Sequence, residues 1–292
     1  MSDGAISILA QAILNGLMTG TLIAVPAIGF TAIFAVLRYP SFGVAAYVTI
    51  GGFAGWFANT NWGFGVMPAL AVAFVVAGAA GVVAEEGALR RLRPSGALTV
   101  AIATIAVNLI LENVVRFIFG NDLRGYDLPL KPDLRFLDLR VGPQQIENVV
   151  LAGLVMLAVF AFLRFTRFGK AMRAVADNVD LARLKGIDPR MVAVITLFLG
   201  AGLSGVGGVL LAVDTSIDPL AGARILLSVF AAAVLGGLGS IPGAVLGAFA
   251  VGIAEELSLL VVPATYRTAI GFAAILIMLT FRPRGILGER AA

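Results

Sequence analysis

Apolar residues along the chain are grouped into nine long runs that short polar gaps separate. The runs lie at about 5–37, 41–58, 66–84, 97–119, 148–163, 191–213, 225–238, 241–260 and 265–281. Runs of about 20 apolar residues are the signature of membrane-spanning helices. The pattern therefore predicts an all-α, polytopic membrane protein with about nine (8–10) transmembrane helices, folded as a single domain over residues 1–292.

Two of these runs are short and meet at a glycine-rich break, Gly236 to Gly243 (GGLGSIPG). A full span takes about 20 residues, so 225–260 forms either two short tilted helices or a re-entrant pair. The chain holds 35 glycines, and small residues four apart let helix backbones approach closely in lipid. The Gly200–Gly208 and Gly243–Gly247 segments show this spacing and predict close helix packing.

Basic residues collect in three of the gaps: at Arg90, Arg91 and Arg93; from Arg164 to Arg190; and at Arg282, Arg284 and Arg290. Cytoplasmic loops of membrane proteins carry an excess of lysine and arginine, so these gaps are expected inside. The loop from Gly120 to Glu147 has four basic and five acidic residues and is expected outside, as is a loop marked by Asp214 and Asp218. The predicted N-terminus is therefore outside and the C-terminus inside.

Composition excludes several classes of function. Charged residues make up 13% of the chain and hydrophobic ones 60%, whereas soluble domains average about 25% charged. Cysteine and histidine are absent, so no catalytic site, metal site or cofactor site is predicted. A net charge of +4 is too small to indicate nucleic-acid binding, and the first apolar run lacks the basic start of a cleaved signal peptide.

One charged segment interrupts the apolar pattern in the middle of the chain. Residues 170–189 hold seven charges, and Met172, Val175, Val179 and Ala182 recur at helical spacing. Gly186 is placed to end a helix, and Asp188 followed by Pro189 is a start signal for the next one. A capped cytoplasmic helix over about 168–187 is predicted. It could rest on membrane lipid, but its mixed charges favour docking on a protein partner.

Four stretches carry a family resemblance that runs from about residue 12 to 288: RFGKAMRAVAD at 167–177 followed by Gly186-Ile187, AIGF at 27–30, VLGGLGSIPGA at 234–244, and RPRGILG at 282–288. Together they resemble the permease subunits of branched-chain amino acid ABC importers. The glycine-rich string and the final motif are long enough to be specific.

The resemblance implies a permease subunit in a bacterial inner (plasma) membrane, without its own motor. It implies two separate ABC ATPase subunits, a second homologous permease and an extracytoplasmic solute-binding protein. The chain has no G-x-x-x-x-G-K-[ST] phosphate loop, which agrees with ATP hydrolysis in a partner. Segment 168–187 then corresponds to the family's coupling helix, with Arg173, Ala176, Asp177, Arg183, Gly186 and Asp188 as candidates for coupling to the ATPase.

The chain departs from the family after the first span. An Asn-Phe-Ala-His-Gly-like stretch is common there, and this sequence has Tyr39-Pro40-Ser41-Phe42-Gly43. The substrate therefore stays open among branched-chain amino acids, urea, short amides and aromatic acids. Non-helical backbone at membrane depth is tolerated where it lines a cavity or is buried in protein. The pathway candidates are accordingly Thr19, Ser41, Phe42, Tyr47, Gly237, Gly239 and Ser240, with packing against the partner permease as the alternative for the glycines.

Ionisable residues inside the spans define the competing hypotheses. Glu112 and Arg116 are four apart on one helix face and can neutralise each other. An ion relay at Glu112 would instead indicate an ion-coupled secondary transporter. Glu85 and Glu86 are expected at a solvated, salt-bridged helix end or an ATPase contact, and Glu255 and Glu256 have Arg267 as a possible partner. A membrane scaffold without solute flux is a third hypothesis.

Overall fold

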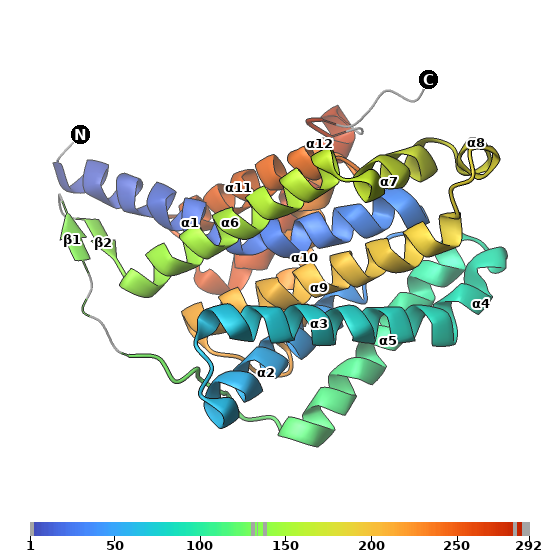
Figure 1. The fold of residues 1–292 in the computed structure, drawn as a ribbon. Helices are drawn as coiled ribbons and strands as arrows, with labels where there is room; N and C mark the ends of the chain where they lie inside the picture. The colour runs from blue at the N-terminus through green and yellow to red at the C-terminus, as the bar shows by residue number, and fades with distance from the viewer. Residues whose placement is uncertain (1–2, 130–131, 133, 137–138, 283–284, 288–292) are drawn as a thin grey trace.

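The computed structural model describes residues 3–129, 132, 134–136, 139–282 and 285–287. Within this part the helices are α1 Asp3–Leu37, α2 Val44–Trp62, α3 Val66–Ala84, α4 Arg90–Leu92, α5 Ala97–Phe119, α6 Pro143–Phe165, α7 Arg167–Asp177, α8 Val179–Leu184, α9 Pro189–Thr215, α10 Ala221–Gly236, α11 Ile241–Ser258 and α12 Arg267–Phe281. A π-helical turn, η1, covers Glu85–Leu89, and 3₁₀ turns cover Arg93–Ser95 (η2) and Ala264–Tyr266 (η3). Figure 1 shows a bundle with α4, α7 and α8 at one end (the α7 end) and the N-terminus at the other.

Each predicted apolar run coincides with one of the long helices. In the described part, six helices are long and apolar enough to cross a membrane: Ile6–Leu37, Val66–Ser95, Ala97–Phe119, Pro143–Phe165, Pro189–Thr215 and Ile241–Ser258. Segment 225–260 forms two short helices, α10 with 16 residues and α11 with 18. The prediction of an all-helical polytopic membrane protein is thereby confirmed at the level of fold class.

Helices α1 and α9 form the centre of the bundle. In their most apolar windows, 83% of α1 and 72% of α9 is buried, against 11% of α6. α1 packs on α9, α10 and α11, and α9 also packs on α2 and α3. Pro26 lies inside α1, and its ring rests against Gly207 of α9, where a Cβ atom would lie 2.6 Å from the proline Cδ. The glycine makes room for the proline ring inside the continuous helix α1.

Glycines bring the central helices into backbone contact. A Cβ at Gly208 of α9 would overlap the carbonyl oxygen of Val48 in α2, and one at Gly247 of α11 would overlap that of Ala232 in α10. Gly200 packs on Gly29, whose carbonyl oxygen would lie 2.7 Å from a Cβ at Gly200. Small residues are the means by which helices associate in lipid, where apolar burial supplies no driving force between them. The close packing predicted at Gly200–Gly208 and Gly243–Gly247 is confirmed.

Helix α10 begins against the first turns of α2. Gly222 lies on the carbonyl of Ala45, and the Gly222 N–H donates to Thr49 Oγ1 at 3.1 Å. The N-cap residue Leu220 makes no side-chain cap, so the Thr49 hydroxyl from α2 satisfies one free N–H at the start of α10. The preceding loop is fixed by an isolated bridge between Arg124 and Ile217.

The loop between α5 and α6 contains two short strands that the all-α prediction did not include. β1 (Leu134–Phe136) pairs antiparallel with β2 (Leu139–Val141), with Leu134 opposite Val141. The Gln11 side chain in α1 donates to the Arg140 carbonyl at 3.0 Å and accepts from its N–H at 2.9 Å. Three-residue strands that depend on docking to another helix leave too little pattern to be read from sequence. The strands lie with the N-terminus at the end opposite α7 (the hairpin end).

Candidate functional site

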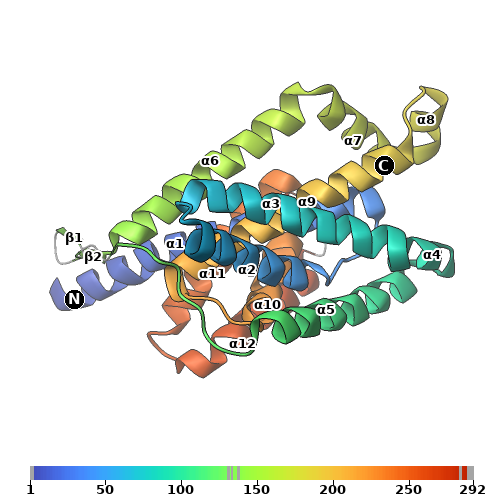
Figure 2. The same ribbon diagram turned by 60° about the horizontal axis from the view of Figure 1, so that its bottom comes forward.

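The charged segment between α6 and α9 forms two helices where the sequence predicted one over 168–187. α7 begins after Thr166, whose hydroxyl accepts from the Gly169 N–H at 3.1 Å. α7 ends at Asp177, and Asn178 begins α8 by accepting from the Leu181 N–H at 2.9 Å. Asn178 has extended backbone angles, so it breaks the helix while capping the next one. In Figure 2, α7 and α8 project at the edge of the bundle.

The predicted caps at the end of this segment are confirmed. Gly186 adopts φ +79°, its N–H donates to the Arg183 carbonyl at 2.9 Å, and the Ile187 N–H donates to the Ala182 carbonyl at 3.0 Å. This pair of bonds is the Schellman motif, which favours glycine at the left-handed position. Asp188 Oδ1 accepts from the Arg190 N–H at 2.9 Å, with Pro189 as the first residue of α9.

The apolar stripe of α7 is directed into the protein itself. Met172, Val175 and Ala182 are buried against α1 and α9 in a cluster that also holds Val36 and Val192. Val179 was predicted in the same stripe but is 39% exposed, because the break at Asn178 rotates α8 relative to α7. The stripe therefore fixes α7 to the two central helices of the bundle, and its polar side faces away from them.

The coupling candidates lie on or beside the outer surface. Arg173 is exposed, but its Nη1 donates to the Leu163 carbonyl at 2.7 Å, which satisfies a free carbonyl in the last turn of α6. The Ala176 carbonyl accepts a hydrogen bond from the Arg38 guanidinium. Asp177, Gly186 and Asp188 are exposed.

Helix α8 exposes both charged and apolar side chains. Arg183 lies 3.8 Å from Asp180, and both are well exposed, so this pair contributes little to stability. Leu181 and Leu184 are 54% and 84% exposed. Exposed leucines beside charged residues at the tip of a projecting segment suit a contact with a protein partner.

Ion pairs tie the end of α3 to neighbouring elements at the α7 end. Glu86 accepts from Arg90 at 2.6 Å and from Arg190 of α9 at 3.2 Å. Glu85 was expected to be solvated, but it is buried and is paired with Arg93 and with the Tyr39 hydroxyl, which donates to it at 2.6 Å. Burial and the Glu85 carboxylate raise the pKa of Tyr39, so this tyrosine stays a neutral donor. The π-helical turn η1 carries both glutamates.

The glycine-rich break and the C-terminal motif meet in space. Gly237 and Gly239 have φ of +103° and +95°, and Ser240 caps α11 by accepting from the Gly243 N–H at 3.3 Å. The Ile286 and Leu287 N–H groups donate to the carbonyls of Leu235 and Gly236 at 2.8 and 3.0 Å. The tail thus satisfies the last carbonyls of α10. Pro283, Arg284 and Gly288 of the motif, and Arg290, lie outside the described residues.

The early pathway candidates occupy different surroundings. Ser41 and Tyr47 are buried, and neither hydroxyl has a hydrogen-bond partner in the described part of the chain. The Phe42 N–H donates to Thr104 Oγ1 at 3.0 Å, and its ring lies 5.9 Å from that of Phe230. Thr19 donates to Glu256 at 3.1 Å and lines a polar cavity near the hairpin end.

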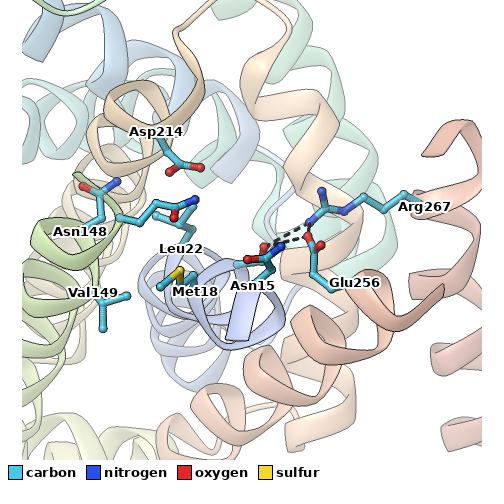
Figure 3. A pocket seen from close by; sticks show the side chains of 10 residues that line it. Asn15, Met18, Leu22, Asn148, Val149, Asp214, Glu256 and Arg267 are labelled. Carbon is cyan, nitrogen blue, oxygen red and sulfur yellow. Dashed lines mark hydrogen bonds and ion pairs between the residues drawn. The ribbon is translucent and has the colours of Figure 1, made fainter. Parts of the chain in front are cut away.

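This cavity has a volume of about 160 Å³ and is lined by side chains of α1, α6, α9, α11 and the first residue of α12 (Figure 3). The predicted partnership of Arg267 is confirmed, since it contacts Glu255 at 3.1 Å and Glu256 at 2.8 Å. Asp214 was expected in an external loop, but it lies in the last turn of α9 and lines the cavity.

Sequence reasoning did not single out Asn148, Gln145 or Arg38. Asn148 and Gln145 line the cavity from the first turns of α6, and Arg38 links the end of α1 to α7. The available signal was an amide near the start of an apolar run and a lone arginine at the end of one. The predicted pair Glu112–Arg116 is confirmed at 2.7 Å.

The chain was compared with known proteins. Residues 12–280 match the family model for the permease component of branched-chain amino acid transport systems. The chain is 32% identical to the high-affinity branched-chain amino acid transport system permease protein LivH of Escherichia coli K12, over 96% of this chain and 95% of that protein. It is 31% identical to the corresponding protein BraD of Pseudomonas aeruginosa, with the same coverage. A probable LivH of Methanocaldococcus jannaschii is 27% identical over 84% of this chain and 80% of that protein.

Proposed function

This chain belongs to the family of permease components of branched-chain amino acid transport systems, and we propose that it forms the membrane pathway of an ATP-binding-cassette importer for branched-chain amino acids or a related small polar solute. It is a multi-pass protein of the inner membrane. The observation that carries the proposal is the surface of α7 and α8. Its apolar stripe is fixed to α1 and α9, while its charged residues and two leucines face outward.

This arrangement provides a physical route for coupling. An ATPase that holds the outer surface of α7 and α8 would displace the helices to which the stripe is packed. Packed cores respond to such displacement by switching between discrete arrangements. Because the chain has no phosphate loop, the energy comes from states that nucleotide stabilises in the partner. Asp177, Arg183 and Leu184 are the proposed contacts, and Gly186 sets where α8 ends.

We further propose nine membrane crossings, with the N-terminus outside and the α7 end in the cytoplasm. The support is the concentration of arginine and lysine at the α7 end. The proposed assembly has two ATPases, a second homologous permease and an extracytoplasmic binding protein at the hairpin end. Helix α5 exposes Ile102, Leu109 and Phe117, a surface suited to lipid or to the second permease.

The solute pathway is proposed to involve Thr19, Ser41, Phe42 and Tyr47 from the first two helices, with Gly237, Gly239 and Ser240 at the α10–α11 turn. Buried hydroxyls without partners, as at Ser41 and Tyr47, are costly in a static core. They would gain partners if a polar solute passed or if the helices rearranged during alternating access.

Reversing the charge of Asp177 tests the coupling surface. Asp177→Arg is expected to lower ATP-dependent solute uptake at least about tenfold, because a like-charge contact opposes docking. Its abundance in the membrane should be normal, since Asp177 is exposed. Uptake into membrane vesicles and the amount of co-purifying ATPase would both be measured. Asp122→Arg, at an exposed site in the loop that follows α5, is the matched control. Normal uptake by Asp177→Arg at equal abundance would contradict the assignment.

The alternative function, ion-coupled secondary transport, rests on the acidic residue Glu112 inside α5. Glu112 is ion-paired with Arg116 at 2.7 Å, and glutamine keeps an acceptor for that guanidinium, so Glu112→Gln is expected to leave uptake per folded protein within about twofold. Uptake into vesicles should need internal ATP and continue when ionophores collapse the ion gradients. ATP-independent uptake that Glu112→Gln abolishes would instead establish the secondary transporter.

A further inference from the structure

The cavity near the hairpin end has room for a small solute. It lies within this chain, between α1, α6, α9, α11 and the start of α12, and its volume is about 160 Å³. A cavity of about 150 Å³ accommodates benzene, so the space suits a solute of roughly six heavy atoms. A larger and more open hollow of about 520 Å³ borders it, shares Asn15 and Glu256 with it, and extends to Arg140 of the hairpin.

The charges around the cavity are not balanced. Arg267 is shared between Glu255 and Glu256, and Asp214 is a third carboxylate nearby. Among the described residues Asp214 forms no hydrogen bond and no ion pair, so one guanidinium faces three carboxylates. Ionised groups inside a membrane protein are costly unless a partner offsets them. The cavity therefore favours a cationic group on the ligand and disfavours an anionic group inside it.

Asn148 supplies a second acceptor. It is 3% exposed, its Nδ2 donates to the Leu210 carbonyl at 3.1 Å, and its Oδ1 has no partner in the described part of the chain. A buried acceptor without a donor destabilises a protein. Figure 3 shows Asn148 and Asp214 on the side of the cavity away from Glu256 and Arg267. The unpaired carboxylate and the unpaired amide oxygen are thus on the same side.

The rest of the wall near these residues is apolar. Met18 and Leu22 of α1 and Val149 of α6 line the cavity. A metal ion would leave this aliphatic space unfilled, whereas a short alkyl chain would occupy it and bury apolar surface. The lining thus matches a ligand with one ammonium end and one aliphatic end.

We propose that this cavity binds the ammonium group and aliphatic part of a small solute, with the ammonium held by Asp214 and Asn148 Oδ1 and the alkyl part against Met18, Leu22 and Val149. The site lies inside one permease chain and needs no residue from a second permease. The inference deepens the proposed function and rests on it for the physiological ligand. A branched-chain amino acid carries both groups, and its carboxylate would lie outside this cavity, in the adjoining hollow that Arg140 lines.

Binding of isopentylamine to the full chain, purified in detergent with whatever subunits accompany it, tests the site. Calorimetry should show saturable binding, and Asp214→Asn should weaken it at least about tenfold, because a charge-assisted hydrogen bond is lost. Val149→Phe fills the cavity and should abolish binding while leaving α6 on the bundle surface. Asp122→Asn is the matched control and should bind like the unaltered chain.

Three results would contradict the proposed ligand class, and the binding assay can succeed or fail independently of the proposed importer function. Equal binding of 4-methylpentanoate, saturation by sodium chloride alone, or unchanged affinity in both cavity variants would each overturn the proposed ligand class. The binding assay needs neither ATP nor partner subunits, whereas uptake needs both. Specific isopentylamine binding without any ATP-driven uptake would therefore support the site and reject the importer.

Discussion

Replacing Gly208 with valine is expected to abolish accumulation of the folded protein in the membrane. A Cβ at this position would overlap the carbonyl oxygen of Val48, and the contact joins the backbones of α9 and α2. Overpacking in a core costs about 1–3 kcal/mol and occasionally more, and a backbone contact cannot be relieved by a side-chain rotation. Membrane abundance and the melting temperature in detergent would be measured.

Gly153 provides the control for this substitution. It lies inside α6, where a Cβ would meet no described atom within 4 Å, so Gly153→Val tests the effect of the residue type in a membrane helix. This variant should accumulate normally and melt within a few degrees of the unaltered protein. If Gly208→Val also did so, the close α2–α9 crossing would not exist in the membrane.

The main helices could be predicted because the solvent of this protein is lipid. A spanning helix must satisfy its own backbone and present apolar side chains all round, so each run in the sequence became one helix. The helix-capping residues could also be predicted from the sequence. The Asp188-Pro189 start and the Gly186 stop depend on chemistry within a few residues, and both are present in the structure.

Features that depend on contacts with a distant part of the chain could not be predicted from the sequence. Asn178 divides the predicted cytoplasmic helix, and nothing in the local pattern excluded a continuous helix across it. The first turn of α10 depends on Thr49 of α2, whose hydroxyl accepts a hydrogen bond from the Gly222 N–H. The apolar stripe of α7 could have faced a partner or the chain's own core, and only its packing on α1 and α9 decides between them.

The same limit applies to the cavity. Asp214, Asn148 and Thr19 come from three helices, and each has an ordinary interpretation when it is considered alone. Asp214 was interpreted as part of an external loop because an acidic residue near the end of an apolar run usually marks one. The signal that distinguishes it is the absence of a partner for its carboxylate among the described residues, which requires the neighbouring helices to be in place.

Replacing Arg267 with methionine is expected to cause a loss of stability comparable to that at the glycine crossing. The change leaves Glu255, which is 3% exposed, and Glu256 without their shared guanidinium. Removing one partner of a buried ion pair costs about 3–5 kcal/mol. The cost here should be about 3 kcal/mol, the lower end, because the Arg267 side chain is 36% exposed. Abundance and melting temperature in detergent report the effect.

A compensating variant distinguishes an electrostatic cause from a packing cause. The triple variant Arg267→Met, Glu255→Gln, Glu256→Gln removes all three charges and keeps the shapes of the two glutamate side chains, and neutral replacements of buried ion pairs are often tolerated. Ser228 and Thr19, which contact Glu255 and Glu256 in the structure, can donate to the new amides. The triple variant should therefore recover most of the stability that Arg267→Met loses. Equal instability of the two variants would show that Arg267 stabilises the protein through its alkyl chain.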